Sequence, residues 1–375
     1  MRDLPPGPVR LQLFLGPAVP VAAPKFVLDA LTGLKVESGS GDAQSGFELT
    51  FSVSKDSPVQ AFFPISVPVF RCVVAVTVRG VTEVLVDGVV THQDMTAAGP
   101  TSVLHVKGKD LTYVMDLVPF DGLPFPAISP AVRALVLLSK YAALGCAPVV
   151  IPSLLEDVPI PLDRIPSQQG TDYAYLTALA KEVGHVFYID PGPVPGVSKA
   201  YWGPEIRLGA PQPALNIGLD GAHDNVATLN FTFDKEKREL PIVAIQERLS
   251  KAPVNLPIPD IAPIRPPLGL VPPLPPKLHH MNDTAKLSPL AAVMKGIAYA
   301  AEHSDAVFAS GTLDVAKYGH VLRSRRLVGV RGAGPAFDGL YYVTRVTHDI
   351  KRGAYTQTFS LARNGVVSTV PAVPV

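Results

Sequence analysis

The sequence is poor in charged residues and shows no imbalance between acidic and basic side chains. Only 17% of its 375 residues are charged, and 33 Lys and Arg stand against 32 Asp and Glu, a formal net charge of +1. Such a chain has no long-range field that would attract nucleic acid or acidic lipid. Hydrophobic residues make up 47%, which is typical of a packed, strand-rich protein with large contact surfaces. We therefore exclude global charge as the basis of recognition.

Cysteines and long apolar runs are scarce as well. Cys72 and Cys146 lie far apart and lack C-x-x-C spacing, which excludes a disulfide framework and a thiolate zinc site. The proline-punctuated start, residues 1–6, has no signal-peptide core. The apolar stretches 67–78 and 131–138 are interrupted by Arg or Pro, short of the roughly 20 residues that a membrane span needs. We expect cytoplasmic synthesis and no membrane span.

Histidines do not form a metal-binding pattern. His279 and His280 are adjacent, and neighbouring side chains on an extended chain point to opposite sides, so the pair cannot bind one ion together. The sequence has no H-E-x-x-H motif. The other candidates lie in unrelated segments: His105, His185, His303, His320 and His348. We expect these side chains to be hydrogen-bonded in the interior or solvated, and we expect neither a metal nor another cofactor.

Nucleophile and phosphate-binding motifs are missing too. Gly39-Ser40-Gly41 and Ala309-Ser310-Gly311 do not complete a G-x-S-x-G elbow. Gly332-Ala333-Gly334 precedes Pro335 instead of a helix N-terminus, which indicates a turn and not a phosphate site. We therefore predict no catalytic residues, and a protein that is not an enzyme.

Three other features leave alternatives open. Carboxylate pairs such as Asp157 with Asp163, or Glu182 with Asp190, occur in any chain of this length, so a tip-associated cell-wall hydrolase remains one alternative. Tyr201-Trp202 could stack on a sugar in a carbohydrate-binding adhesin, although a single tryptophan is more often a buried anchor. The basic residues 323–326 favour a solvated loop or the rim of an interface over a nucleic-acid patch.

The first 120 or so residues show the period of two that is typical of β-strands. Residues 47–53 alternate between apolar and polar side chains, which predicts a strand with one buried face. Further strands are predicted at 71–79, 83–91 and 102–106. Asp87-Gly88 lies between apolar runs and indicates a hairpin turn.

Helical signals begin after this β-rich part. Ser129-Pro130 predicts a helix N-terminus, and that helix should end near Gly145. Apolar residues recurring every four positions predict a second helix over 171–183, ended by Gly184. Strands are predicted after it, at 185–189, 226–233 and 240–246.

Prolines are so dense between Lys251 and Lys277 that neither a helix nor an inner strand is possible there. We expect a polyproline-like connector that can lie along a neighbour's surface. Ser288-Pro289 begins a third helix, and a final β stretch follows at 326–362. The sequence predicts a mainly β fold with an α+β insertion. Its divisions are a β-barrel at 1–125 that later segments can help complete, an inserted domain at 126–250, a linker at 251–285, and a helix plus second β-barrel at 286–375.

Three groups of segments resemble the late control gene D family of phage tail proteins and the VgrG-type spike proteins of contractile injection systems. The family's inserted domain is resembled by Gly170–Gly184, Phe187–Asp190 and Tyr201–Pro204. Its first β-domain is resembled by Lys25–Leu31, Ser45–Phe51, Gly88–Thr91 and Val106–Leu111. Its second β-domain is resembled by Gly339–His348 and Tyr355–Asn364.

The resemblance implies two tail-tube-like β-barrel domains in each chain. A homotrimer would then present six barrels and would join a six-fold tail tube to a three-fold spike. The implied partners are an inner tube or tube-initiator protein, baseplate wedge proteins and a separate spike, because the sequence does not continue into a needle. The implied location is the baseplate of an assembled phage-like particle.

Overall fold

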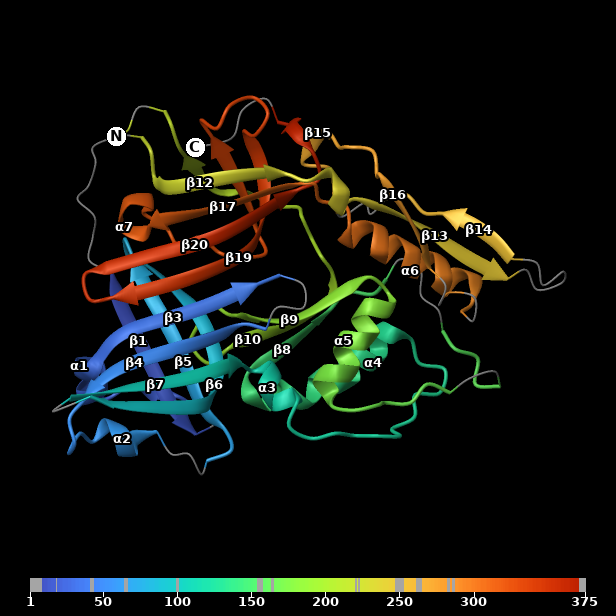
Figure 1. Ribbon diagram of the computed structural model, residues 1–375. Helices are drawn as coiled ribbons and strands as arrows, with labels where there is room; N and C mark the ends of the chain where they lie inside the picture. Colours follow the sequence, from blue (N-terminus) through green and yellow to red (C-terminus); the bar gives the residue numbers. More distant parts are fainter. Residues whose placement is uncertain are drawn as a thin grey trace.

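The computed structural model describes residues 9–17, 19–40, 44–63, 67–98, 101–153, 158–162, 165–219, 221, 223–246, 253–260, 265–281, 284 and 287–370. Strands predominate over helices, as the sequence predicts (Figure 1). No helix in this described part is both long enough and apolar enough to span a bilayer.

The first β unit has six main strands in the spatial order β3-β4-β7-β6-β5-β1, with the two-residue β2 (Val21–Ala22) beside β1. Neighbouring strands are antiparallel throughout. Two short helices, α1 (Lys25–Ala30) and α2 (Val59–Phe62), accompany them. The strands are β1 (Arg10–Pro17), β3 (Leu31–Gly39), β4 (Gly46–Val53), β5 (Phe70–Val78), β6 (Val81–Ala98) and β7 (Thr101–Asp110).

The second β unit repeats this arrangement in the order β12-β17-β20-β19-β18-β11. Each strand takes the place of one strand of the first unit in the same chain order, and α7 (Val315–Tyr318) occupies the place of α2. One difference is that β11 runs parallel to β18, whereas β1 is antiparallel to β5. The strands are β11 (Gln212–Asn216), β12 (Val226–Phe233), β17 (Val307–Asp314), β18 (Leu327–Arg331), β19 (Gly339–Lys351) and β20 (Ala354–Arg363).

Two irregularities of register recur at equivalent places in the two units. The β3–β4 pairing shifts between Leu31 and Gly33, and the β12–β17 pairing shifts between Val226 and Thr228. The β6–β7 pairing shifts after Val90, and the β19–β20 pairing shifts after Val343. Because a bulge fixes which residues face each side, the two units are structural duplicates, although the sequence shows no clear repeat.

The two units share one sheet, because β3 pairs with β19 from Gly33–Lys351 to Gly39–Arg345. In Figure 1 the strands follow one another from β12 through β17, β20, β19, β3, β4 and β7. Among the described strands the pairing does not return on itself, so the predicted pair of separate closed barrels is corrected to one continuous, open sheet. A single hydrophobic cluster runs through both units, from Leu13 to Leu361.

The inserted α+β unit follows β7 and lies beside the sheet (Figure 1). Two of its helices begin where the sequence predicts, at Pro130 and Asp172, and Thr171 Oγ1 accepts a hydrogen bond from the Ala174 N–H. The predicted helix end near Gly145 is confirmed, since Gly145 caps η1 in a left-handed conformation. The elements are α3 (Thr112–Met115), α4 (Pro130–Ser139), η1 (Lys140–Leu144), β8 (Cys146–Val150), α5 (Asp172–Glu182), β9 (His185–Pro191) and β10 (Ser198–Pro204), with strand order β8-β10-β9.

The described residues between 234 and 306 form a smaller lobe, inserted between β12 and β17, whereas only six positions separate the equivalent strands β3 and β4. Its three-stranded sheet has the order β14-β13-β16, and α6 packs on β13. The predicted division is therefore corrected: β11 and β12 belong to the second β unit, and part of the proline-rich segment forms strands. The elements are η2 (Lys235–Lys237), β13 (Glu239–Gln246), β14 (Pro253–Pro257), β15 (Gly269–Val271), β16 (Lys277–Met281) and α6 (Pro289–Glu302); β15 pairs with β21 (Val366–Ser368).

Two prolines of this segment, Pro253 and Pro257, lie at the ends of the edge strand β14. Among the described residues β14 and β16 flank the central β13, so each has one side without a partner strand. A proline can occupy such an edge because its missing N–H faces away from the ladder. The absence of an inner strand between Lys251 and Lys277 was therefore predicted correctly for the described residues, whereas the expectation of a plain connector was wrong.

The predicted hairpin turn at Asp87-Gly88 is also corrected, because both residues lie inside β6 and the turn comes at Arg79-Gly80. Gly88 is needed for close packing instead, since a Cβ there would collide with the Lys109 carbonyl oxygen. Gly108 on β7 is equally restricted: its Cβ would collide with the Phe47 ring and the Val89 carbonyl oxygen.

We predict that Gly108→Ala lowers the free energy of unfolding by about 1–3 kcal/mol, because the methyl group has no space in the packed sheet. Gly33→Ala is the matched control, since the atom nearest to its new Cβ, Thr50 Cβ, is 3.8 Å away. Urea unfolding followed by circular dichroism measures both variants. Equal stability of the two would contradict the packing around Phe47.

Candidate assembly site: buried junctions and open sheet edges

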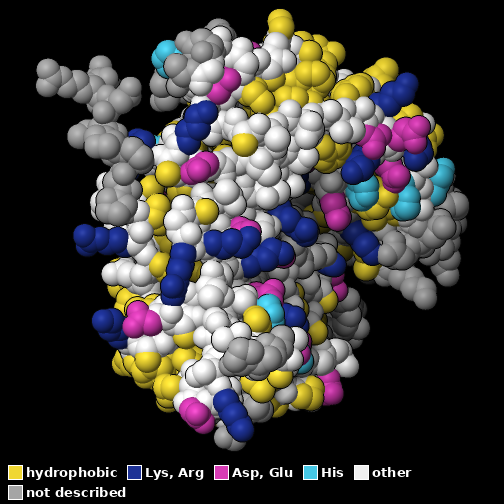
Figure 2. All heavy atoms as spheres, turned by 60° about the vertical axis from the view of Figure 1, so that its left-hand side comes forward, with side chains coloured by type: hydrophobic (Ala, Val, Ile, Leu, Met, Phe, Trp, Pro, Cys, Tyr) yellow, Lys and Arg dark blue, Asp and Glu magenta, His cyan; other side chains and the backbone are white. Residues whose placement is uncertain are grey.

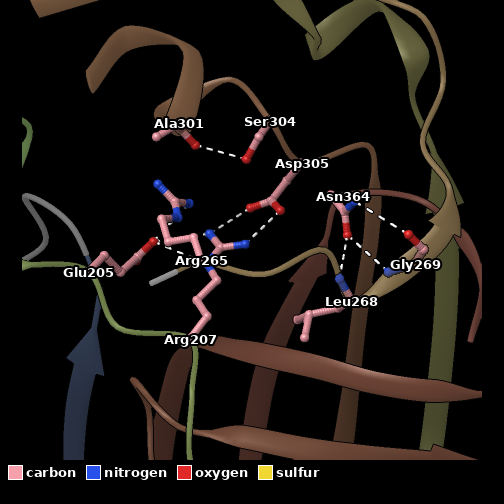
Figure 3. Close-up of polar contacts among 9 residues, drawn as sticks. All are labelled: Glu205, Arg207, Arg265, Leu268, Gly269, Ala301, Ser304, Asp305 and Asn364. Atoms are coloured by element: carbon pink, nitrogen blue, oxygen red, sulfur yellow. Dashed lines mark hydrogen bonds and ion pairs between the residues drawn. The ribbon is translucent and has the colours of Figure 1, made fainter. Parts of the chain in front are cut away.

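A buried ion pair joins the segment between β10 and β11 to the end of the lobe, just before β17 (Figure 3). Arg207, in the segment after β10, donates to both carboxylate oxygens of Asp305 at 2.7 and 2.8 Å. Glu205 Oε2 accepts from Arg207 Nε and Nη2, and Arg265 Nη2 lies 2.8 Å from the same oxygen. The bidentate geometry fixes the orientation of both partners. Four side chains from three segments thus meet in one network.

The charges in this network shift one another's pKa. Burial alone would raise the pKa of Asp305, but the Arg207 charge and hydrogen bonds outweigh burial and hold that pKa below its usual value. Burial alone would lower the pKa of Arg207, yet Asp305 and Glu205 raise it. Both groups are therefore ionised at neutral pH.

Backbone contacts anchor the proline-rich segment beside this network (Figure 3). The N–H groups of Leu268 and Gly269 donate to Asn364 Oδ1 at 2.8 and 3.0 Å. Asn364 follows the last residue of β20. The start of the segment is thus fixed to the end of the main sheet.

A second buried junction joins the inserted unit to the first β unit. Arg71 on β5 donates to both carboxylate oxygens of Asp87 on β6, at 2.7 and 2.6 Å. Arg71 also donates to the Gly196 carbonyl oxygen, and Ser198 Oγ donates to Asp87 Oδ2 at 2.9 Å. The sequence carries one local signal for this pair, a lone arginine within the apolar run 67–78; Arg207 and Asp305 carry none, because 98 positions separate them.

The basic residues 323–326 lie between the two β units and the inserted unit, not on a nucleic-acid surface. Arg323 Nη2 donates to the Val84 carbonyl oxygen at 3.1 Å, and Arg323 Nε lies 3.6 Å from Glu83. Ser324 Oγ lies 3.0 Å from Ser38 Oγ. The Arg325 guanidinium stacks 3.9 Å from the centre of the Tyr188 ring. Residues 323–325 thus pack within the chain, and Arg326 is exposed.

The predicted candidate histidines are dispersed. Burial lowers the pKa of His348 to about 3, and its Nδ1 lies 2.7 Å from Tyr355 Oη. Burial lowers the pKa of His185 to about 4, and its ring packs edge-on against Trp202. His105 pairs with Glu48 at 2.9 Å. His320 packs edge-on against Tyr318.

His279 and His303 come together from β16 and α6. Their rings stack on Tyr299, with ring centres 4.5 and 4.0 Å away, while His280 is exposed on the edge strand β16. In the described part of the chain, no three or more His, Cys, Asp or Glu side chains are placed to hold a metal ion.

The remaining candidates from the sequence are a sugar-stacking tryptophan, a glycine-rich turn and two carboxylate pairs. Trp202 is fully buried and donates from Nε1 to the Leu176 carbonyl oxygen at 3.2 Å, so it is a core anchor and cannot stack on a sugar. Gly332-Ala333-Gly334 lies in the turn between β18 and β19. Glu182 ends α5 and Asp190 lies on β9. Asp157 and Asp163 lie outside the described residues.

The main sheet has several open edges among the described strands, and those of β12 and β6 are two of them. The outer side of β12 is open, and its residues Val226–Phe233 include no charge, proline or glycine. Residues 92–98 of β6 pair with β7 on one side only, and β5 pairs no further than Val89. Natural sheets usually protect long free edges with charges or prolines, so the plain edge of β12 is suited to pairing with another strand.

The outer surface supports assembly by shape and backbone pairing more than by charge. Figure 2 shows basic and acidic side chains interspersed over one face, with hydrophobic side chains gathered at its upper end. On the exposed face of the central strands, Lys35 pairs with Glu37 and Lys107 with Asp94. Such a face carries no field of one sign.

Solved structures with this architecture are phage tail proteins and a secretion-system component. A tail protein from Neisseria meningitidis MC58 has a TM-score of 0.64 and 12% identity, over 96% of this chain and 98% of that chain. The prophage MuSo2 43 kDa tail protein from Shewanella oneidensis has a TM-score of 0.63 and 15% identity, over 95% and 99%.

An E. coli component of the type VI secretion system, described as structurally similar to T4 bacteriophage tail proteins, has a TM-score of 0.54 and 13% identity, over 92% and 78% of the two chains. No family model and no curated protein matches the sequence. The chain therefore has the fold of these tail proteins.

We predict that Asp305→Asn lowers the free energy of unfolding by about 3 kcal/mol at pH 7, because it removes the bidentate partner of the buried Arg207 and leaves Glu205, shared with Arg265, as its remaining acidic partner. The folded-state pKa of Asp305 is lowered, so its contribution is present above the ordinary carboxylate pKa of about 4 and is lost as pH falls through the lower folded value. The difference between wild type and variant should therefore narrow below about pH 4.

Asp94→Asn is the control, because Asp94 makes an exposed ion pair with Lys107 and exposed pairs contribute little. Denaturant unfolding of all three proteins at pH 7 and pH 3 provides the measurement. A difference between wild type and Asp305→Asn that does not depend on pH would contradict the assigned ion pair.

Proposed function

We propose that this chain is a structural hub of a phage tail or contractile injection system, and not an enzyme. In this proposal three copies form a ring whose six β units match a six-fold tail tube, while the ring itself has three-fold symmetry for a separate spike. Baseplate wedge proteins would contact its outside. The supporting observation is the duplication of the β unit together with its unused edges.

The duplication specifies how one copy would meet the next. Within the chain, β3 of the first unit pairs with β19 of the second. The structural equivalents of β3 and β19 are β12 and β6, and both expose the corresponding edge. The same contact can therefore be made between copies, with β12 of one copy against residues 92–98 of β6 in the next.

The two matching bulges fix the register of that contact. Counted from them, Asn230 corresponds to Lys35 and Thr96 corresponds to Asp349. Lys35 is paired with Asp349 inside the chain. The proposed contact therefore places Asn230 of one copy opposite Thr96 of the next. Repeating a head-to-tail contact closes a ring when the rotation between units allows it.

We predict that Thr96→Cys combined with Asn230→Cys forms a disulfide between copies, because directly opposed residues of antiparallel strands have the spacing that a disulfide requires. Non-reducing gels after mild oxidation should show covalently linked copies. Met95→Cys with Asn230→Cys is the matched control, since a slip of one residue turns the side chains to opposite faces.

A positive control is available within the chain. Lys35→Cys with Asp349→Cys should cross-link without joining copies, since these residues are a register pair of one molecule. The proposed contact would be overturned by one combination of results. In it the internal control forms its disulfide, whereas copies of the Thr96→Cys, Asn230→Cys protein are not linked at any concentration or with tube protein present.

We also predict that native mass spectrometry finds three copies in each complex. The expected mass is about 119 kDa, three times the 39.8 kDa of one chain, for copies that assemble alone, and this mass plus that of the partner when tube or spike protein is bound. A monomer under every one of these conditions would overturn the hub assignment.

A further inference from the structure

The proline-rich segment contains an exposed stretch that neither the core nor the proposed ring contact uses. Residues 271–277, Val-Pro-Pro-Leu-Pro-Pro-Lys, connect β15 to β16. Proline holds φ near −65°, and a residue that precedes proline is restricted to extended conformations. Four residues of this stretch precede a proline, so the stretch is held in polyproline II geometry in which little chain entropy remains to be lost on binding.

Most side chains of the stretch are exposed, and Leu274 is the most exposed apolar one. Leu274 is exposed at 88% and Val271 at 55%, and Pro272, Pro276 and Lys277 are exposed as well. Pro273 and Pro275 are only half-buried. An aliphatic residue exposed to this degree between prolines presents a projecting apolar group on a stiff backbone.

Both ends and the middle of the stretch are fixed to the body of the protein. At one end Gly269 and Val271 pair with β21, and at the other Lys277 pairs with Glu239 of β13. Between them, Arg238 Nη1 donates to the Pro273 carbonyl oxygen at 2.6 Å. Leu274 is therefore presented outward by contacts that do not cover it.

We propose that this stretch is a docking ligand for a different protein, which receives Leu274 and the flanking prolines in a groove lined by aromatic side chains. Aromatic-lined grooves recognise P-x-x-P segments because prolines pack on aromatic rings and the helix is already formed. Pro272 and Pro275 have that spacing. Lys277, three residues beyond Leu274 and also exposed, selects a groove with a carboxylate at its end. This assignment does not rest on the ring contact and engages a different surface.

The first experiment tests the recognition chemistry on the full chain. The probe is a purified SH3 domain that selects P-x-x-P-x-K ligands, and binding is followed by the tryptophan fluorescence of its groove. We expect saturable binding that weakens at least tenfold in Leu274→Asp and in the double variant Pro272→Ala, Pro275→Ala. Leu162→Asp, at a side chain 96% exposed on the inserted unit, is the matched control and should bind as wild type does.

Unchanged far-ultraviolet circular dichroism and unfolding midpoints establish that each variant is folded. Absence of binding by the wild-type chain, or equal binding by all variants, would overturn the docking ligand.

The second experiment identifies the occupant. A photo-reactive benzoylphenylalanine replaces Leu274 in the full chain, in cells that make the neighbouring tail proteins, and the cross-linked peptides are sequenced. We expect one protein to be linked at one site with aromatic and acidic residues, and the link to that purified protein to disappear in the double proline variant. Linkage only to a second copy of this chain, to scattered sites, or to nothing would overturn the assignment.

Discussion

Backbone pairing between β3 and β19 is the contact on which the arrangement of the molecule depends. It joins strands more than 300 positions apart and converts two similar β units into one sheet with a shared core. The open edges of β12 and of residues 92–98 of β6 are equivalent to the edges of β3 and β19 that are paired inside the chain. The internal contact is therefore the basis of the contact between copies that we propose.

Buried charge then fixes how the inserted unit is oriented on that sheet. Arg71 with Asp87, and Arg207 with Asp305, each make two hydrogen bonds across or beside a junction. Ion pairs of this kind contribute little net stability because desolvation offsets the attraction, but an alternative orientation would leave a charge buried without its partner. Apolar contacts alone would tolerate sliding. The two pairs thus select one relative position, which a protein that holds several neighbours in register requires.

Local signals in the sequence were sufficient for single elements but not for their pairing. Ser129, Thr171 and Ser288 each precede a helix, and the predicted strand 226–233 matches β12, because capping and side-chain alternation act over a few residues. Asp87-Gly88 was misassigned because a turn sequence can also occur where a sheet needs close backbone approach. The duplication was not readable because the equivalent positions share only apolar character and bulge position, and because a lobe separates β12 from β17. The Arg207 network could not be predicted, since nothing local connects residues that only the fold brings together.

The lobe inserted between β12 and β17 interrupts the likeness of the two β units at one hairpin, since only six positions separate the equivalent strands β3 and β4. Around a closed ring, β units without the lobe and β units with the lobe would alternate. A partner protein that contacts only the backbone of the sheet would have an equivalent binding site on every β unit. A partner that contacts the lobes would have half as many binding sites. A single inserted segment would thus let one surface serve partners of two different multiplicities.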